Sequence, residues 1–175
     1  MRGAHGDSRR LGYPAMIQGL VVALAVAAAL GSGVVAGFFF AFSVCVMRAL
    51  GRLPREQGMA AMQAINVVVL NPWFFTAFFG TAAVCMIVTV LALFTWSASR
   101  MLSLLAGSVL YLAGSIVVTM ACNVPLNEAL AAVDAPSAEG AALWTRYRAQ
   151  WTAWNHVRTA ASLGAAALFI AAVCL

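Results

Sequence analysis

Long runs of apolar residues, separated by short polar stretches, make up most of this chain. Four of the runs are long enough to cross a bilayer, which takes about 20 residues in a helix. They extend from Ala15 to about Met47, from Pro72 to about Trp96, from Met101 to about Cys122, and from Val157 to Leu175. The pattern predicts an all-α protein, a bundle of four transmembrane helices.

Two of the connections between these runs have helical patterns of their own. A short helix is expected from Gly58 to Leu70, after an arginine-rich loop that begins at Arg48. An aromatic, amphipathic helix is expected from Trp144 to Arg158, leading into the fourth membrane helix. Because the chain crosses the bilayer twice between them, both connections lie at the same end of the bundle.

The domain organisation is simple, with a polar tail followed by one membrane domain. Residues 1–14 are predicted to be a disordered tail, and residues 15–175 form the single domain. In the first helix, Gly33 and Gly37 are one turn apart, which predicts a close approach of another helix.

Composition supports insertion in a membrane. The chain is 64% hydrophobic and 9% charged, whereas soluble domains carry roughly 25% charged residues. The net charge is +5, and the ten basic residues, all Arg, are dispersed among loops. This excludes the clustered basic patch of a nucleic-acid-binding protein and predicts contact with lipid headgroups. We expect a bacterial inner-membrane protein whose N-terminus, with Arg9 and Arg10, is cytoplasmic, although the first loop also carries arginines.

The four cysteines give no metal or disulfide pattern. They lie in separate apolar stretches, without CxxC spacing, and are expected to behave as small apolar residues. Their positions are Cys45, Cys85, Cys122 and Cys174.

The segment from Trp144 to Arg158 carries the densest group of aromatic and polar side chains. Helical spacing places one set of side chains on a shared face, with Asn155 beside them and His156 roughly a third of a turn away. This set is Trp144, Tyr147, Trp151, Trp154 and Arg158. Either the segment caps a polar pocket at the boundary of water and lipid, or it is an interfacial aromatic belt with a snorkelling arginine.

Two pairs of amide side chains lie near the same end of the bundle. Gln63 and Asn66 share a face of the short helix. Asn123 and Asn127 flank Pro125, which is expected to break or kink the third helix and leave Asn123 free to cap the next piece. The interpretations are a shared cavity lined by these amides, or a helix that ends at the interface with both asparagines in water.

Four stretches of the chain resemble the anthrone oxygenase-like family of small four-helix membrane proteins. The matching strings, in order, are GFFFAFSVCVMRAL (37–50), AMQAINVVVLNPWF (61–74), NVPLNEAL (123–130) and WxxYxxxWxxWNHVR (144–158). Fungal members, after which the family is named, oxidise anthrones to anthraquinones. The resemblance implies the four-helix fold more firmly than it implies an activity.

If the activity carries over, the chain is a cofactor-free oxygenase of planar aromatic lipophiles, with no metal and no cofactor. His156 would be the base, because imidazole is suited to proton transfer near neutral pH. Arg158, Asn123 and Asn127 would stabilise the oxyanion. The substrate-binding residues would be Gln63, Asn66, Trp144, Tyr147, Trp151, Trp154 and Asn155.

The sequence leaves open whether the protein is an enzyme. The alternative is a non-catalytic membrane module that binds a small lipophile or packs against another membrane protein, and a homo-oligomer fits either interpretation. A metal or haem site would have to use one histidine, His156, together with methionines and Cys122, which is weak support.

Overall fold

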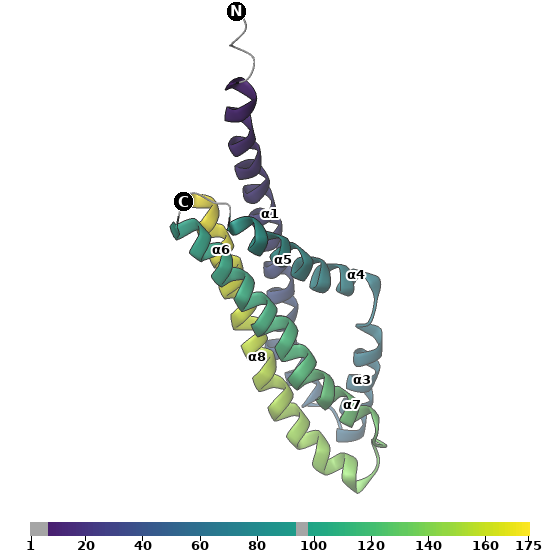
Figure 1. Ribbon diagram of the computed structural model, residues 1–175. Coiled ribbons are helices and arrows are strands. Elements are labelled where there is room, and N and C mark those ends of the chain that lie inside the picture. Colours follow the sequence, from purple (N-terminus) through teal and green to yellow (C-terminus); the bar gives the residue numbers. More distant parts are fainter. Residues whose placement is uncertain (1–6, 94–97) are drawn as a thin grey trace, which may run out of the picture.

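Every regular element in the described part of the chain is a helix. The computed structural model describes residues 7–93 and 98–175 (Figure 1). The elements are α1 (Asp7–Ala41), η1 (Phe42–Val46), α2 (Met47–Leu50), α3 (Arg55–Val68), α4 (Pro72–Phe75), η2 (Thr76–Gly80), α5 (Thr81–Ala92), α6 (Ala98–Tyr111), η3 (Leu112–Val117), η4 (Thr119–Asn123), α7 (Val124–Ala131) and α8 (Ala138–Cys174), where η marks a π-helical segment.

Four of the continuous helical runs are long and apolar enough to cross a membrane. They are Met16–Leu50, Pro72–Ala92, Ala98–Ala131 and Ala138–Cys174. The predicted all-α bundle with four membrane helices is confirmed, and so are the short helix after the first span (α3) and the aromatic segment that leads into the fourth. The protein is an integral membrane protein.

The expected tail falls partly outside the described residues. We expected residues 1–14 to be disordered. Residues 1–6 lie outside the described ranges, whereas residues 7–14 continue α1 as helix. The predicted end of the second span at Trp96 lies outside them too, because α5 ends at Ala92 and residues 94–97 are not described.

Helix α8 is the centre of the bundle, packing along α1 and α6, while α5 packs against α1 and α6 (Figure 1). Small residues make these approaches close. A side chain added at Gly114 would collide with Ala161, and one at Gly31 would collide with Thr81. The contact predicted at Gly33 and Gly37 is not formed within this chain, since a Cβ at either would meet no atom within 4 Å.

The third helix was expected to break or kink at Pro125, and it does not break there. The chain runs continuously through η3, η4 and α7. Pro125 is the second residue of α7 and has no N–H to donate, so the hydrogen-bond ladder is interrupted where η4 passes into α7. The wider π turns of η4 lie directly before it. Asn123 makes no cap hydrogen bond, and its side chain donates instead to the Trp151 carbonyl (3.3 Å).

A cluster of buried apolar side chains, called the end cluster below, closes the end of the bundle at which Figure 1 shows α3 and α7. The Gln63 amide donates to the carbonyls of Leu130 (2.8 Å) and Val133 (3.1 Å), which fastens α3 to α7. The buried members of this end cluster are Met47, Leu50, Met59, Met62, Leu130, Leu143, Trp144, Tyr147 and Trp151.

Candidate functional site

Arg158 on α8 is buried in the bundle, with only 5% of its surface exposed. One terminal nitrogen donates to Thr119 Oγ1 (3.1 Å) and the other to Asn155 Oδ1 (2.7 Å). The guanidinium carbon lies 4.1 Å from the centre of the Phe39 ring and 5.2 Å from that of Trp151. Two aromatic faces and two neutral acceptors therefore hold this cation in place.

No carboxylate neutralises Arg158 in the described part of the chain. The one ion pair found there joins Arg55 and Glu56 at the surface. The Nε atom of Arg158 is buried and has no hydrogen-bond partner. Burying a cation without an anion is costly, so this arrangement favours a ligand that supplies negative charge or an acceptor oxygen.

Asn155 sets the position of this arginine. Its side-chain nitrogen donates to the Phe39 carbonyl (2.6 Å) and to Ser43 Oγ (2.7 Å), both contributed by the first span. Its oxygen faces Arg158, three residues further along α8. Asn155 therefore ties α8 to α1 and η1 and orients the guanidinium at the same time.

A cavity of about 100 Å³ lies beside Arg158. Three buried polar atoms of its lining residues have no hydrogen-bond partner: Nδ2 of Asn66, Oδ1 of Asn123 and Nε of Arg158. Buried polar groups without partners are uncommon in folded proteins and call for an explanation such as an absent ligand. The cavity is lined by Phe38, Phe39, Phe42, Ile65, Asn66, Val69, Leu70, Phe74, Thr119, Asn123, Val124, Asn127, Trp151 and Arg158.

Hydrogen bonds to Asn127, which lines the cavity, fix two aromatic side chains, Tyr147 and Trp151. The Asn127 side-chain oxygen accepts from the Tyr147 hydroxyl (2.9 Å) and from Trp151 Nε1 (2.9 Å). The rings of Tyr147 and Trp151 are stacked, with centroids 6.4 Å apart. The Trp151 ring is thus fixed from behind where it borders the cavity.

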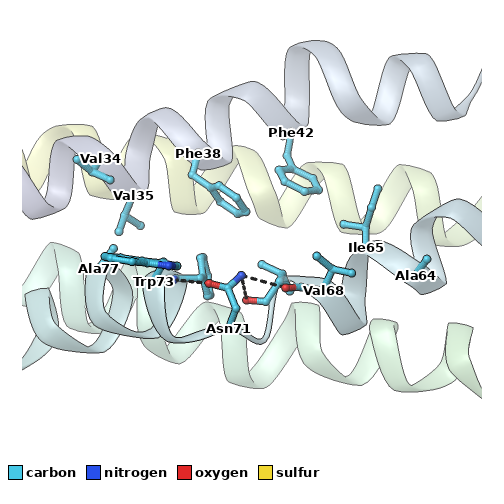
Figure 2. Close-up of a pocket in the computed structure, with 12 residues that line it drawn as sticks. Val34, Val35, Phe38, Phe42, Ala64, Ile65, Val68, Asn71, Trp73 and Ala77 are labelled. Carbon is cyan, nitrogen blue, oxygen red and sulfur yellow. Dashed lines mark hydrogen bonds between the residues drawn. The ribbon is translucent and has the colours of Figure 1, made fainter.

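A larger apolar groove adjoins the cavity. Its volume is about 530 Å³, and it lies between α1 and η1 on one side and α3, α4 and η2 on the other. Figure 2 shows Phe38 and Phe42 projecting across the groove towards Val68, Asn71 and Trp73. The groove is lined by Val34, Val35, Phe38, Phe42, Ala64, Ile65, Val68, Val69, Asn71, Trp73, Phe74 and Ala77.

The family model for anthrone oxygenase matches residues 73–168, more than half of the chain. The chain belongs to the anthrone oxygenase family. No curated protein and no solved structure matches it. The part matched to the anthrone oxygenase family contains Asn123, Asn127, Trp151, Asn155 and Arg158, whereas the walls supplied by α1 and α3 lie outside the match.

The structure brings together several of the side chains singled out in the sequence of this anthrone oxygenase family member. Asn66, Asn123, Asn127, Trp151 and Arg158 line the one cavity. Asn155 lies directly behind Arg158 and is fully buried.

The remaining predicted site residues lie elsewhere. Gln63 joins α3 to α7 through its hydrogen bond to the Leu130 carbonyl. Trp144 and Tyr147 belong to the end cluster, where their rings stack with centroids 5.7 Å apart. Trp154 is 41% exposed and does not line the cavity. His156 is exposed and lines a separate hollow on the outside of α8.

That second hollow carries cationic side chains and has a volume of about 550 Å³. Arg48 and Arg148 line it together with His156. The catalytic role predicted for His156 would therefore require chemistry at a place other than the buried cavity.

Sequence analysis missed the hydroxyl groups of the site. Thr119 binds Arg158, and Ser43 binds Asn155. Each lies four residues from another residue of the site, because Thr119 precedes Asn123 and Ser43 follows Phe39 by one helical turn. That spacing is a signal that places them on the same helix faces.

The described residues contain no cluster of three or more His, Cys, Asp or Glu side chains arranged to hold a metal ion. The donors around the cavity are amides, a hydroxyl and a guanidinium. This set is suited to binding a carbonyl or an oxyanion through hydrogen bonds.

Proposed function

We propose that the protein is a cofactor-independent oxygenase that acts on planar, lipophilic aromatic ketones in the membrane. Its substrates carry a carbonyl and an activated CH₂ group, as anthrones do. The oxygen of the substrate lies in the cavity, where Arg158 Nε and Asn66 Nδ2 are the free donors.

The chemistry requires only an electron-rich anion and molecular oxygen. Loss of one proton from the activated carbon gives an enolate, whose negative charge lies largely on oxygen. The enolate gives one electron to O₂, and recombination of the two radicals forms a C–O bond. After the peroxide takes up a proton, loss of the second C–H proton breaks the O–O bond. The carbon becomes a carbonyl, and the other oxygen atom leaves as water.

In this proposal Arg158 stabilises the enolate. A buried guanidinium with an unused N–H and no anionic partner among the described residues is the observation that carries the proposal. In a dry, fixed environment such a donor interacts with a developing oxyanion much more strongly than it does in water. Stabilising the anion also favours release of the proton from the substrate carbon.

The proposal does not depend on His156 as the base. Among the residues that line the cavity there is no histidine and no carboxylate. A water molecule beside the substrate is therefore the proton acceptor in this proposal, and a cavity of about 100 Å³ has room for one. The base hypothesis for His156 is a separate one that the same assay tests.

Oxygen consumption with anthrone tests the proposal directly. The full-length protein is reconstituted in phosphatidylcholine nanodiscs and given anthrone, and the rate above that of empty nanodiscs is measured. Removing one oxyanion donor typically lowers turnover about 10²–10³-fold. We expect a loss of this size for Arg158→Met and near wild-type activity for His156→Ala, whose side chain is exposed on the same helix.

The opposite pattern would overturn the assignment. If His156→Ala abolished turnover and Arg158→Met retained it, the histidine would be the catalytic group and the buried cavity would not be the site. If the wild-type protein consumed no O₂ above background, the oxygenase proposal itself would fail.

A non-catalytic lipophile-binding module is the second candidate. The absence of a proton acceptor from the cavity lining favours it. It predicts that anthrone binds saturably to the wild-type protein but is recovered unchanged, with no O₂ consumed.

A further inference from the structure

The cavity beside Arg158 is too small for a molecule of several rings. Its volume is about 100 Å³, smaller than an engineered cavity of roughly 150 Å³ that holds one benzene molecule. It therefore accommodates the oxygen-bearing edge of a substrate and no more of that molecule. The rest of a molecule of the proposed substrate class has to lie elsewhere.

The apolar groove is the adjoining space. Its volume of about 530 Å³ lies within the ~300–1,000 Å³ range of small-molecule sites. Cavity and groove share part of their walls, so a ligand in the groove lies against the side chains that border the cavity. The shared residues are Phe38, Phe42, Ile65, Val69 and Phe74.

The groove offers little to the polar atoms of a ligand. Asn71 is the one amide side chain that lines it, and its hydrogen-bonding groups are already used. The Asn71 oxygen accepts from the Phe74 amide (3.1 Å), and the nitrogen donates to the Val68 carbonyl (2.9 Å). A ligand is therefore held there by apolar contact, with its oxygen directed inwards to the unpartnered N–H donors of Arg158 (Nε) and Asn66 (Nδ2).

The walls of the groove favour flat rings over an acyl chain. The Phe38 ring centroid lies 4.9 Å from that of Phe42 and 5.1 Å from that of Phe74. Aromatic side chains at these spacings present faces and edges on which a planar ring system stacks. The groove thus matches the ring system of the proposed substrate, as the inner cavity matches its oxygen.

The rim of the groove faces outwards and is apolar. Val34 is 63% exposed, Val68 is 71% exposed and Trp73 is 87% exposed. In a protein that spans a membrane, such apolar side chains on the outside contact lipid. A lipophile dissolved in the bilayer can reach the groove sideways, without crossing water.

We infer that this groove is the ring-binding half of the site and its opening to the bilayer. A planar ligand of two or three fused rings enters from lipid between α1 and α3–α4, with its oxygen-bearing edge leading towards Arg158. This inference rests on the proposed function for the identity of the ligand, but it is tested by binding alone.

The test uses anthraquinone, a planar ketone that lacks an oxidisable CH₂ group. Its binding to the full-length protein in phosphatidylcholine nanodiscs is followed as saturable quenching of tryptophan fluorescence, with empty nanodiscs as the blank. Ala77→Phe fills the groove, whereas Ala83→Phe adds the same ring at an exposed position of α5 outside it. We expect half-saturation to rise about 10- to 100-fold for Ala77→Phe, which corresponds to about 1.4–2.8 kcal/mol, and to stay unchanged for Ala83→Phe.

The outcomes separate this inference from the oxygenase proposal. Equal binding by the wild type and both variants would overturn the assignment of the groove as the ring-binding site, whatever the activity with anthrone. Quenching that does not saturate in the wild type would also overturn it, as expected if an acyl chain of lipid occupied the groove. Selective loss of binding in Ala77→Phe, without any O₂ consumption in the wild type, would support the groove and refute the oxygenase.

Discussion

Two consecutive residues of α8 face in different directions: Asn155 is buried in the bundle, whereas His156 is exposed. Successive helical residues are roughly 100° apart around the axis. Trp151, Asn155 and Arg158, at steps of four and three, share the inward face, whereas His156 follows Asn155 directly and turns outwards. Chemical suitability pointed to His156, and helical geometry points to Arg158.

We predict that Arg158→Met does not destabilise the protein. Methionine has a similar length, and the substitution removes a cation buried without an anion. Replacing buried charges by apolar residues is often neutral or stabilising by about 1–4 kcal/mol. The apparent melting temperature, followed by circular dichroism in detergent, is expected to equal or exceed that of the wild type. Any loss of activity would then reflect lost chemistry.

Asn155→Ala is the matched comparison for that measurement. It removes the hydrogen bonds that Asn155 makes with the Phe39 carbonyl and with one terminal nitrogen of Arg158, and each buried group left unsatisfied costs about 1–3 kcal/mol. Its melting temperature is expected to fall. If Arg158→Met fell equally, Arg158 would be a structural residue and the argument for a ligand would lose its main support.

Amide residues of the site were predictable at this scale, and its hydroxyl groups were not. Asn66, Asn123 and Asn127 stand out because amides are rare and costly inside apolar helices. Thr119 and Ser43 do not stand out, because hydroxyl side chains in membrane helices commonly bond to their own backbone, as Thr81 does with Ala77.

At the scale of elements, α3 determines the shape of both cavity and groove. It supplies Asn66 and Ile65 to the cavity and Ala64 and Val68 to the groove. Its position depends on a close approach at Gly58, where an added Cβ would lie 2.5 Å from the Leu50 carbonyl oxygen.

We predict that Gly58→Ala destabilises the protein by about 1–3 kcal/mol, the usual cost of overpacking. The colliding atom belongs to the backbone and cannot turn away, so α3 has to shift. Gly33→Ala is the control, because a Cβ there meets nothing within 4 Å and alanine favours a helix over glycine. Thermal unfolding in detergent measures both variants. Equal melting temperatures would show that α3 is not held at Gly58.

The sequence predicted the type of each element better than its contacts. Apolar length alone identifies the four spans. It does not say which small residues face a neighbour, so Gly33 and Gly37 were chosen where Gly31 makes the contact. Nor does it show that η4 would precede Pro125 and that the helix would continue through it.

At the scale of the whole molecule, the polar groups gather towards one end of the bundle. Figure 1 shows the end of the bundle where α3, α7 and the start of α8 meet. The cavity lies further inside, because its α8 residues, Trp151 and Arg158, are 13 and 20 residues past Ala138 at the start of that helix. The sequence predicts that the two polar connections share one end, because two spans lie between them and an even number returns the chain to the same side. That argument needs only the number of spans, whereas the role of each residue depends on the direction in which its side chain faces.

The orientation of this end in the membrane is the last prediction. Arg9 and Arg10 precede the first span and favour a cytoplasmic N-terminus, while the arginines of the loop after it favour the reverse. We predict a cytoplasmic N-terminus, which places the hollow with His156 on the outer face. With the four natural cysteines replaced, a membrane-impermeant maleimide added to intact bacterial cells should label Ala138→Cys. Ser8→Cys should react only after permeabilisation. Reversed labelling would invert the orientation, and labelling of both in intact cells would contradict the three spans between these positions.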